Sequence, residues 1–525
     1  MTASSPTHPG SEPAALPIRP SRSSTEPLRF LFVMAAKNYL RHYGPTMRVL
    51  AERGHIVRVV YMKPDKHPDM EPVPADAPPT VAMSSLPATG RPTRWTRLAK
   101  DLRLTVDYVR FLDPRFASAQ FGRRRMEEDL PPAMRRLASI KSLPPRRIDR
   151  VIRCYQALEK AIPTDPTTDD LLRSEHPDVV VVSPGLRHGP AGVRQTDHIK
   201  SAGRLGIPVA LAVASWDHLT FKGLIRLEPD AVVVWNHRQL REAVELHGIP
   251  PEKVLVTGAQ DFDEFFDVRP TVSREEFAAR VGLPPKRRFL LYLGSARNIA
   301  KGDDEVAFVR RWISAIRQSV DPAVAELGIL VRPHPSNIDH WTDADLSELG
   351  DVAVWPRSRP ERWFVNQQAQ ADKLNAFSFC VGAIGINTTA MIEVGAVGRP
   401  VFTVRAAEFA HTQDGTLHFR HLVEGRDGAG LVQIADDLPA HVEQVSAMLR
   451  NHGPSRARVA RFVEEFLRPH GLGQPTVPLV ADALERVAAQ GPTGANVGGP
   501  AHLALRPVLW PIAWRASRRA RRRTP

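Results

Sequence analysis

Residues 376–404, AFSFCVGAIGINTTAMIEVGAVGRPVFTV, constrain the fold of this chain more than any other stretch. The apolar run from Ala376 to Val381 predicts a buried strand, and the glycines after it predict a turn. Asn387-Thr388-Thr389 is typical of a helix start, and Gly398-Arg399-Pro400 ends that helix before a second apolar run at Val401 to Val404. Strand, loop, helix and strand in this order indicate one step of a parallel α/β sheet.

The loop inside this step is a candidate ligand site. Loops at the carboxyl ends of parallel strands hold ligands in open α/β sheets. A helix that opens with hydroxyl residues offers free N–H groups and a positive dipole end, which suit a diphosphate. Glu393, one turn further on, is placed to accept hydrogen bonds from ribose or sugar hydroxyls. The same residues also fit an ordinary capped helix, so the segment favours a ligand site without establishing one.

Similar β/α steps occur in two series, separated by a linker at about 261–272. Strands that alternate with helices indicate parallel sheets, so we predict an α/β protein of two Rossmann-like domains that face each other across a cleft. The strands expected in the first series are 28–34, 56–62, 178–183, 208–214, 231–235 and 253–257, and those in the second are 288–293, 328–332, 352–355, 377–381 and 401–404.

The predicted organisation assigns every part of the chain. Residues 1–27 are rich in Pro, Ser and Thr and are expected to be disordered. Residues 28–262 form the first domain, 93–175 a helical basic insertion within it, 263–474 the second domain, 475–489 a helix that crosses back, and 490–525 a linker and basic amphipathic tail.

The charge of the chain is concentrated in two segments. The net charge is +14, and residues 91–153 hold 17 Lys and Arg against 7 Asp and Glu, while residues 501–525 hold seven Arg and no acid. Such segments attract nucleic acid or anionic lipid. The tail places Trp510, Trp514 and several aliphatic residues before its arginines, which favours an anionic membrane and makes nucleic acid the weaker alternative. A disordered basic tail is the simpler interpretation.

Composition excludes several other classes. The only cysteines are Cys154 and Cys380, so no disulfide framework or zinc cluster is implied. No secretion signal and no apolar run long enough to span a bilayer is present. We therefore expect a cytoplasmic protein, located peripherally at the inner face of the cell membrane.

The motifs HExxH, GxSxG and GxxxxGK[ST] are absent, which counts against zinc proteases, serine hydrolases and P-loop enzymes.

Three further loops carry candidate functional side chains. Asp217, in the segment SWDHLT after a predicted strand, could act as a general base or bind a sugar. Arg332 and His334, in the segment RPHP, could face a phosphate, and His334 could also act as an acid. Gly294-Ser295 permits a close backbone approach to an anion. For each of them an ordinary polar turn remains an alternative.

These segments together resemble a known family. The stretches SWDHLTFKG, VVVWNHRQLREAVELHGIPPEKVLVTGAQDFDEFF, RPHP and GINTTAMIEVGAVGRPVFTV are similar to bacterial glycosyltransferases of the two-Rossmann-domain (GT-B) type. Within that type they most resemble proteins related to the CDP-glycerol glycerophosphotransferases and to surface-polysaccharide synthesis. The resemblance covers about residues 28–490. The basic insertion at 93–175 departs from it, and the first loop, 35–44, lacks the glycine-rich form common in these enzymes.

The resemblance implies roles for individual residues. A nucleotide-activated donor would lie against the second domain, and a glycan or lipid-linked acceptor would enter from the first. No metal or other cofactor is implied. The residues implied to hold the donor are Gly294, His334, Asn387, Thr388, Thr389 and Glu393, with Asp217 on the acceptor side. The loops themselves add Ser295 and Arg332 to the donor-binding candidates, and Asp217 and His334 are the catalytic candidates.

Three functions fit this sequence. The leading hypothesis is a glycosyl- or glycerophospho-transferase in the biosynthesis of cell-surface polysaccharide or glycolipid. A nucleotide-sugar epimerase on the same fold is the closest alternative. The third is a non-catalytic, membrane-associated glycan-assembly protein that has kept the fold, since fold alone does not decide function.

Overall fold

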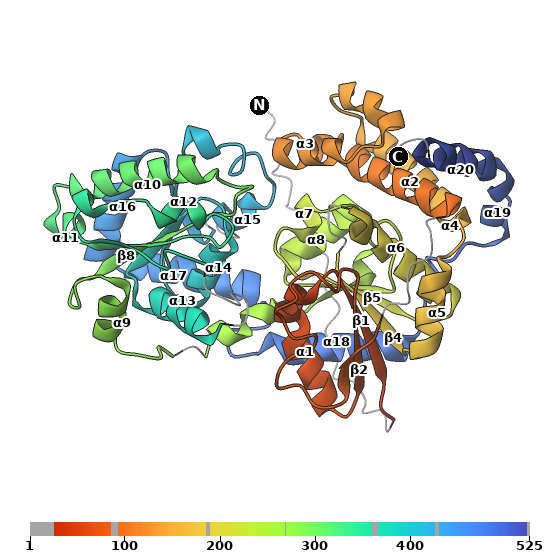
Figure 1. Cartoon of the computed structure of the whole chain (residues 1–525), viewed down its shortest axis with the longest axis horizontal. Helices are drawn as coiled ribbons and strands as arrows, with labels where there is room; N and C mark the ends of the chain where they lie inside the picture. The colour runs from red at the N-terminus through yellow and green to blue at the C-terminus, as the bar shows by residue number, and fades with distance from the viewer. Residues whose placement is uncertain are drawn as a thin grey trace, which may run out of the picture.

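The computed structural model describes residues 26–85, 93–184, 189–267, 269–359, 366–425 and 430–521. Most of the N-terminal segment predicted to be disordered therefore lies outside the described residues. Two parallel β-sheets lie side by side, each covered by helices on both faces (Figure 1). The prediction of an α/β protein with two Rossmann-like domains is confirmed.

The first sheet has seven strands in the order β3-β2-β1-β4-β5-β6-β7. Alternate residues of the buried strands point to opposite faces, so each strand contributes to two hydrophobic cores. The strands are β1 Arg29–Met34, β2 Ile56–Tyr61, β3 Val81–Met83, β4 Val179–Val182, β5 Val209–Ala212, β6 Ala231–Val234 and β7 Val254–Val256, and the helices around them include α1 Leu40–Glu52, α6 Gly189–Arg204, α7 His218–Phe221 and α8 His237–His247.

The second sheet has six strands in the order β10-β9-β8-β11-β12-β13. Both sheets thus follow the doubly wound order, in which the strand sequence reverses beside the first strand, and ligands occupy the crevice at that reversal. The strands are β8 Phe289–Leu293, β9 Gly328–Arg332, β10 Val352–Val354, β11 Gly382–Gly385, β12 Val401–Val404 and β13 Val432–Ala435, and the helices are α9 Arg274–Val281, α10 Gly302–Arg317, α11 Pro322–Ala325, α12 Asp339–Thr342, α13 Gln367–Phe379, α14 Thr389–Ala396, α15 Phe419–Val423, α16 Leu438–Arg450 and α17 Gly453–Phe462.

One predicted strand is wrong. Most of the apolar run from Ala376 to Val381 completes α13, whose buried side chains there join the core, and the strand is the glycine-rich β11 that follows. Little room remains for a side chain in this central strand because its neighbours pack closely against the glycines. A Cβ on Gly382 would lie 3.1 Å from the ring of Phe402, and one on Gly385 would lie 3.2 Å from Met391. The edge strands β3 and β13 were not predicted, and β3 lies in a Pro-rich segment that is untypical of a strand.

The predicted linker packs closely against helices of both domains. Its first part forms a 3₁₀ helix, η5 Gln260–Phe265, which contacts α1, α14 and α18. The carboxylate of Asp263 accepts hydrogen bonds from the Arg468 guanidinium and from the N–H groups of Thr476 and Val477. These last two residues begin α18 Thr476–Gln490, which packs against α1 of the first domain.

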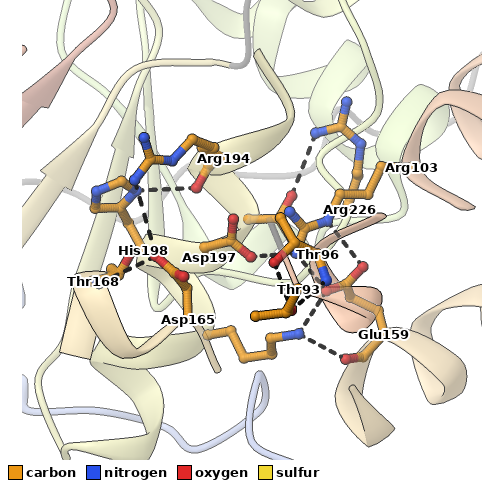
Figure 2. A network of polar contacts seen from close by, with 12 residues as sticks. Thr93, Thr96, Arg103, Glu159, Asp165, Thr168, Arg194, Asp197, His198 and Arg226 are labelled. Atoms are coloured by element: carbon orange, nitrogen blue, oxygen red, sulfur yellow. Dashed lines mark hydrogen bonds and ion pairs between the residues drawn. The ribbon is translucent and has the colours of Figure 1, made fainter. Parts of the chain in front are cut away.

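The basic insertion consists of helices that sit on the first domain (Figure 1). A buried ionic network fastens it there, as Figure 2 shows. Arg103 pairs with Glu159 at 2.7 Å and with Asp197 at 2.5 Å, and Lys200 pairs with Glu159 at 2.7 Å. Burial alone would raise the pKa of Glu159, but Arg103 and Lys200 hold it well below its usual range. The helices are α2 Arg94–Arg110, α3 Gln120–Glu128, α4 Pro145–Ala161 and α5 Pro166–Glu175.

The C-terminal segment also packs on this insertion. Two helices, α19 Pro500–Leu503 and α20 Arg506–Arg521, follow α18, and Pro511 lies inside the second of them. Leu509 and Ala513 of α20 are buried against Leu98 and Ala99 of α2. The tail and the basic insertion therefore form one helical body beside the first domain, in which α20 lies far from the second domain and α3 lies nearest to it (Figure 1).

The ionic network yields a stability prediction. Glu159→Gln should lower the free energy of unfolding by about 3–5 kcal/mol, because it leaves Arg103 and Lys200 buried without their shared carboxylate. Asp170→Asn is the matched control: its pair with Arg173 is largely exposed, so the loss should stay below about 1 kcal/mol. Chemical denaturation measures both, and equal losses would show that the network does not secure the insertion.

Candidate functional site

The loops after β8 and β9 are locked together at the carboxyl edge of the second sheet. Gly294 donates its N–H to the carbonyl of Arg332, and a Cβ at Gly294 would lie 2.6 Å from the backbone nitrogen of His334. Ser295 is fully buried, and its N–H is bonded to a carboxylate oxygen of Glu305. The N–H groups of both residues are therefore occupied, so this loop supports its neighbour instead of offering the anion-binding N–H groups that the sequence suggested.

His334 presents a hydrogen-bond donor from this platform. Its Nδ1 accepts the N–H of Ser336 at 3.1 Å, which leaves the proton on Nε2 and makes that atom a donor. Burial, together with the charges of Arg332 and Arg41, lowers the pKa of His334 to about 4. His334 is therefore neutral at physiological pH. Arg41 belongs to the first domain. Because its charge lowers the pKa of His334, charged groups of the two domains lie close together here.

The start of α14 lies at the same sheet edge. Thr388 is the residue before the helix, and its side chain makes no capping hydrogen bond. Thr389 Oγ1 accepts a hydrogen bond of 3.1 Å from the indole N–H of Trp216, which follows β5 of the first domain. Asn387 is 3% exposed and points inward, where its amide donates to the carbonyl of Thr412. Asn387 thus orders the loop, while Thr388 and Thr389 lie at its outer side.

Arg332 lines a cavity in the second domain, and Glu393 lies beside another of its lining residues, Lys373. Glu393 is 3.6 Å from the ammonium group of Lys373, and its charge acts on Arg332, whose pKa burial lowers. Arg332 and Lys373 line a cavity of about 210 Å³ at the ends of β9 and β10. The remaining lining residues are Leu330, Trp355, Pro356, Asn366, Gln368, Ala369, Asp372 and Ala376, an apolar wall with amide and carboxylate groups.

Asp217 lies opposite, on the first domain, in the turn after β5. Its carboxylate accepts a hydrogen bond of 2.6 Å from Ser215 and is 3.4 Å from the ammonium group of Lys222. Burial alone would raise the pKa of Asp217, but Lys222, His218 and His418 hold it well below its usual range. Asp217 therefore keeps its negative charge, and a carboxylate with so little proton affinity is a weak general base.

Sequence reasoning missed a second group on this side, around His42. Its Nδ1 is 2.8 Å from the carboxylate of Asp261, and its Nε2 accepts a hydrogen bond from Arg41. Burial and Arg41 lower its pKa, while Asp261 opposes that shift. Tyr39 stacks on His218, with ring centroids 6.5 Å apart. The signal was available: polar side chains follow the first strand where the common glycine-rich loop is lacking.

His418 connects the two halves of the site. Its ring meets that of Trp216 edge-on at 4.9 Å, and its Nε2 is 3.5 Å from the Asn387 amide. Burial lowers its pKa to about 4, although Asp217 partly opposes that shift. A neutral His418 therefore lies between the loop of Asp217 and the start of α14. It ends the segment EFAHTQDGTLH, residues 408–418.

The predicted residues thus gather on both sides of one domain boundary. His334, Thr389 and Glu393 lie on the second domain, Asp217 lies on the first, and Gly294, Ser295 and Asn387 support the loops from within. Among the described residues, no group of three or more His, Cys, Asp or Glu side chains is arranged to hold a metal ion. None of the helices in the described part of the chain is long and apolar enough to cross a bilayer.

No model of a known protein family matches the chain, and no curated protein does either. Among solved structures, it is similar to the UDP-GlcNAc 2-epimerase of Neisseria meningitidis bound to UDP-GlcNAc, with 11% identity, a TM-score of 0.48, and coverage of 87% of this chain and 100% of that one.

Transferases occur among the similar structures as well. A glycosyltransferase from Rickettsia africae has 10% identity and a TM-score of 0.45, and covers 88% of this chain and 98% of its own. WaaG, a glycosyltransferase involved in lipopolysaccharide biosynthesis, has 13% identity and a TM-score of 0.42, and covers 87% of this chain and 99% of its own. The solved structures to which this chain is similar thus include both glycosyltransferases and a nucleotide-sugar epimerase.

Proposed function

We propose that this protein is a transferase of the GT-B type that moves a sugar or polyol phosphate from a nucleotide-activated donor to a glycan or lipid-linked acceptor, in the biosynthesis of cell-surface polysaccharide or glycolipid. One observation carries the proposal: cationic and hydrogen-bonding groups of the second domain meet a charged cluster of the first domain at a single boundary, where Arg41 acts on His334 and Trp216 bonds to Thr389.

The donor would lie on the second domain. The cavity beside Arg332 combines the apolar face of Trp355 with the amides of Asn366 and Gln368, a lining that suits a nucleoside. Glu393 would accept hydrogen bonds from hydroxyls of the ribose or sugar. Arg332, the Nε2–H of His334 and the start of α14 at Thr388 and Thr389 would hold the diphosphate, since cations and helix N-termini neutralise such charge. No metal is needed in this arrangement.

The acceptor hydroxyl would approach from the first domain. Two groups there could take its proton, Asp217 and His42. The low pKa of Asp217 favours His42, which is neutral and whose Nδ1–H faces Asp261. The carboxylate of Asp261 would stabilise the imidazolium that forms when Nε2 accepts the proton. Arg41 donates a hydrogen bond to Nε2 in this structure, and the acceptor hydroxyl would replace it there when the acceptor binds. Asp217 would then contribute charge and position rather than proton transfer.

Membrane attachment would place the enzyme beside a lipid-linked acceptor. The outer face of α20 exposes Val508 by 67%, Trp510 by 49% and Ile512 by 49%. Arg94 of α2 lies 5.0 Å above the Trp510 ring, so cationic and aromatic groups share this face. The exposed cations of the same helical body include Arg94, Lys100, Arg146, Arg147, Arg150, Arg153 and Arg515. We propose that this body rests on an anionic membrane at the inner face of the cell membrane.

Donor binding is the first test. A charge-assisted contact contributes roughly 1.5–3 kcal/mol, and a tenfold change in affinity corresponds to about 1.4 kcal/mol. Glu393→Ala and His334→Ala should each weaken nucleotide binding about tenfold or more, as measured by calorimetry with a panel that includes UDP-GlcNAc and CDP-glycerol. Glu348→Ala, which removes an exposed carboxylate elsewhere in the second domain, should have no effect.

The panel and its products also separate the candidate functions. Unchanged affinity in both site variants would remove this donor site, and no binding of any nucleotide would favour the non-catalytic assembly protein. An altered sugar formed without an acceptor would identify an epimerase. A product that appears only when a glycan acceptor is added would identify a transferase.

The identity of the base is the second test. His42→Gln should lower the turnover number by roughly 10²–10⁴, the usual loss when a general base is removed. Asp217→Asn should lower it by less than about tenfold, because the carboxylate of Asp217 is already paired with the ammonium group of Lys222. Steady-state kinetics of folded variants decides. The reverse ranking would restore Asp217 as the base, and two near-normal rates would mean that neither group takes the proton.

Liposome binding is the third test. The double variant Val508→Glu, Ile512→Glu should bind anionic phosphatidylglycerol vesicles at least about tenfold more weakly, because each position would carry a charge into the interface. The substitutions avoid Leu509 and Ala513, so α20 stays packed on α2. Val320→Glu is the control, since Val320 is fully exposed on the second domain. Equal binding by all three proteins would exclude α20 and direct attention to residues 91–153.

A further inference from the structure

A buried acid, Glu305, lies directly beneath the loops that the proposed donor site uses. It belongs to the first turn of α10 and is 0% exposed. One carboxylate oxygen, Oε1, accepts the N–H of Ser295 at 2.7 Å and the hydroxyl of Tyr292 at 3.2 Å. The carboxyl group thus holds the backbone of the Gly294-Ser295 loop at the end of β8. Nothing in the proposed chemistry requires an acid at this position.

Asn337 joins the same cluster from the loop of His334. Its amide nitrogen donates to the carbonyls of Ser295 at 3.0 Å and of Ala300 at 2.9 Å. With both amide hydrogens used, its Oδ1 can only accept, yet it has no partner. Asn337 Oδ1, Glu305 Oε2 and Ser295 Oγ are buried together without a hydrogen-bond partner, and the side chains of Ser295 and Asn337 lie beside the Glu305 carboxyl.

A single proton would complete this cluster. An ionised Glu305 offers only acceptors. The Ser295 hydroxyl can donate to Glu305 Oε2 or to Asn337 Oδ1 but not to both, so one of these acceptors stays without a donor. A protonated Glu305 donates from Oε2 to Asn337 Oδ1 and keeps Oε1 for Ser295 and Tyr292. It also removes a negative charge from the low-dielectric layer beneath the place where the diphosphate would lie. Consistent with this, burial raises the pKa of Glu305 to about 7, and the hydrogen bonds it accepts offset only part of that shift.

Other charges around this turn of α10 have their own partners or face solvent. Tyr292 is held protonated, since burial and Glu305 raise its pKa well above its usual value. His340 pairs with Asp303, Glu408 pairs with Arg311, and Arg297 bonds to Ser336. The titratable and charged groups on the neighbouring elements are Tyr292 on β8, Arg297 and Lys301 after it, His334 after β9, His340 on α12 and Glu408 on the 3₁₀ helix η7 Ala407–Phe409.

We infer that Glu305 is a proton-linked positioning residue of the donor site, which takes up one proton when a nucleotide diphosphate ester binds and thereby couples donor affinity to pH. The inference rests on the proposed function, because that function places the diphosphate at His334, whose loop the Gly294-Ser295 backbone supports. The proton goes from solvent to Glu305 Oε2, and no covalent bond of the donor changes. Glu305→Gln mimics the protonated acid, since its amide donates to Asn337 and its oxygen still accepts from Ser295.

The test measures UDP-GlcNAc binding by calorimetry, because the diphosphate of this ester does not titrate near neutrality. In the wild type, affinity should fall by up to about tenfold per pH unit above about pH 7, with uptake of up to one proton detected in buffers of different ionisation enthalpy. Glu305→Gln should bind at least as tightly as the wild type at about pH 6 and keep that affinity to about pH 8.5. Glu408→Gln, an acid on the neighbouring η7 turn, should retain the wild-type pH dependence.

A measurement without nucleotide supports or overturns the inference separately. A raised carboxyl pKa in the folded state means that the wild type loses stability as pH rises from the ordinary value of a glutamate through about 7. As pH rises across this range, the melting temperature of Glu305→Gln should therefore increase relative to that of the wild type. An unchanged difference, or wild-type binding that does not vary with pH, overturns the proton linkage. Another outcome is that UDP-GlcNAc binds at no pH while the difference in melting temperature between Glu305→Gln and the wild type still changes with pH. In that case the donor proposal fails and Glu305 is only a buried acid.

Discussion

The carboxylate of Asp263 holds the chain together where it passes between the domains. It receives the Arg468 guanidinium, where the second domain ends, and the first two N–H groups of α18, where the chain returns. The same 3₁₀ helix contributes Asp261 to His42 and places Phe262 and Phe265 in the core of the second domain. One short segment thus sets the spacing of the sheets and also positions a group of the candidate site. Its geometry explains why the polar residues of both domains meet at one boundary.

The sequence predicts the repeated parts of this fold well. The strands of both sheets were found mainly from apolar runs that alternate with helices, since that pattern follows from local burial. It failed at Ala376 to Val381, because a buried helix end and a buried strand have the same composition, and at Gly382 and Gly385, where glycine in a central strand reflects the packing of Phe402 and Met391. Only the three-dimensional contact explains those glycines.

The candidate site was predictable to a smaller extent. Asp217, His334 and Glu393 follow strands whose carboxyl ends face the boundary, so their grouping follows from topology. His42 and Asp261 are far apart in sequence, and Asn387 and Ser295 turn inward, where their partners Thr412 and Glu305 come from other loops. Such pairings depend on how loops pack over the sheet edge, which residue types and spacing do not encode.

The position of α18 has a consequence for the synthesis of this chain. Val480, Ala481 and Leu484 complete the core under β1, β4 and β5, and Leu509 later covers Leu98 of the insertion. The first domain emerges from the ribosome long before these residues exist. The apolar face of the first sheet that α18 covers therefore stays exposed while the whole second domain is synthesised. A ribosome that stalls late in the message would release a chain whose early half cannot finish folding, and such exposed surface is a substrate for chaperones and proteases.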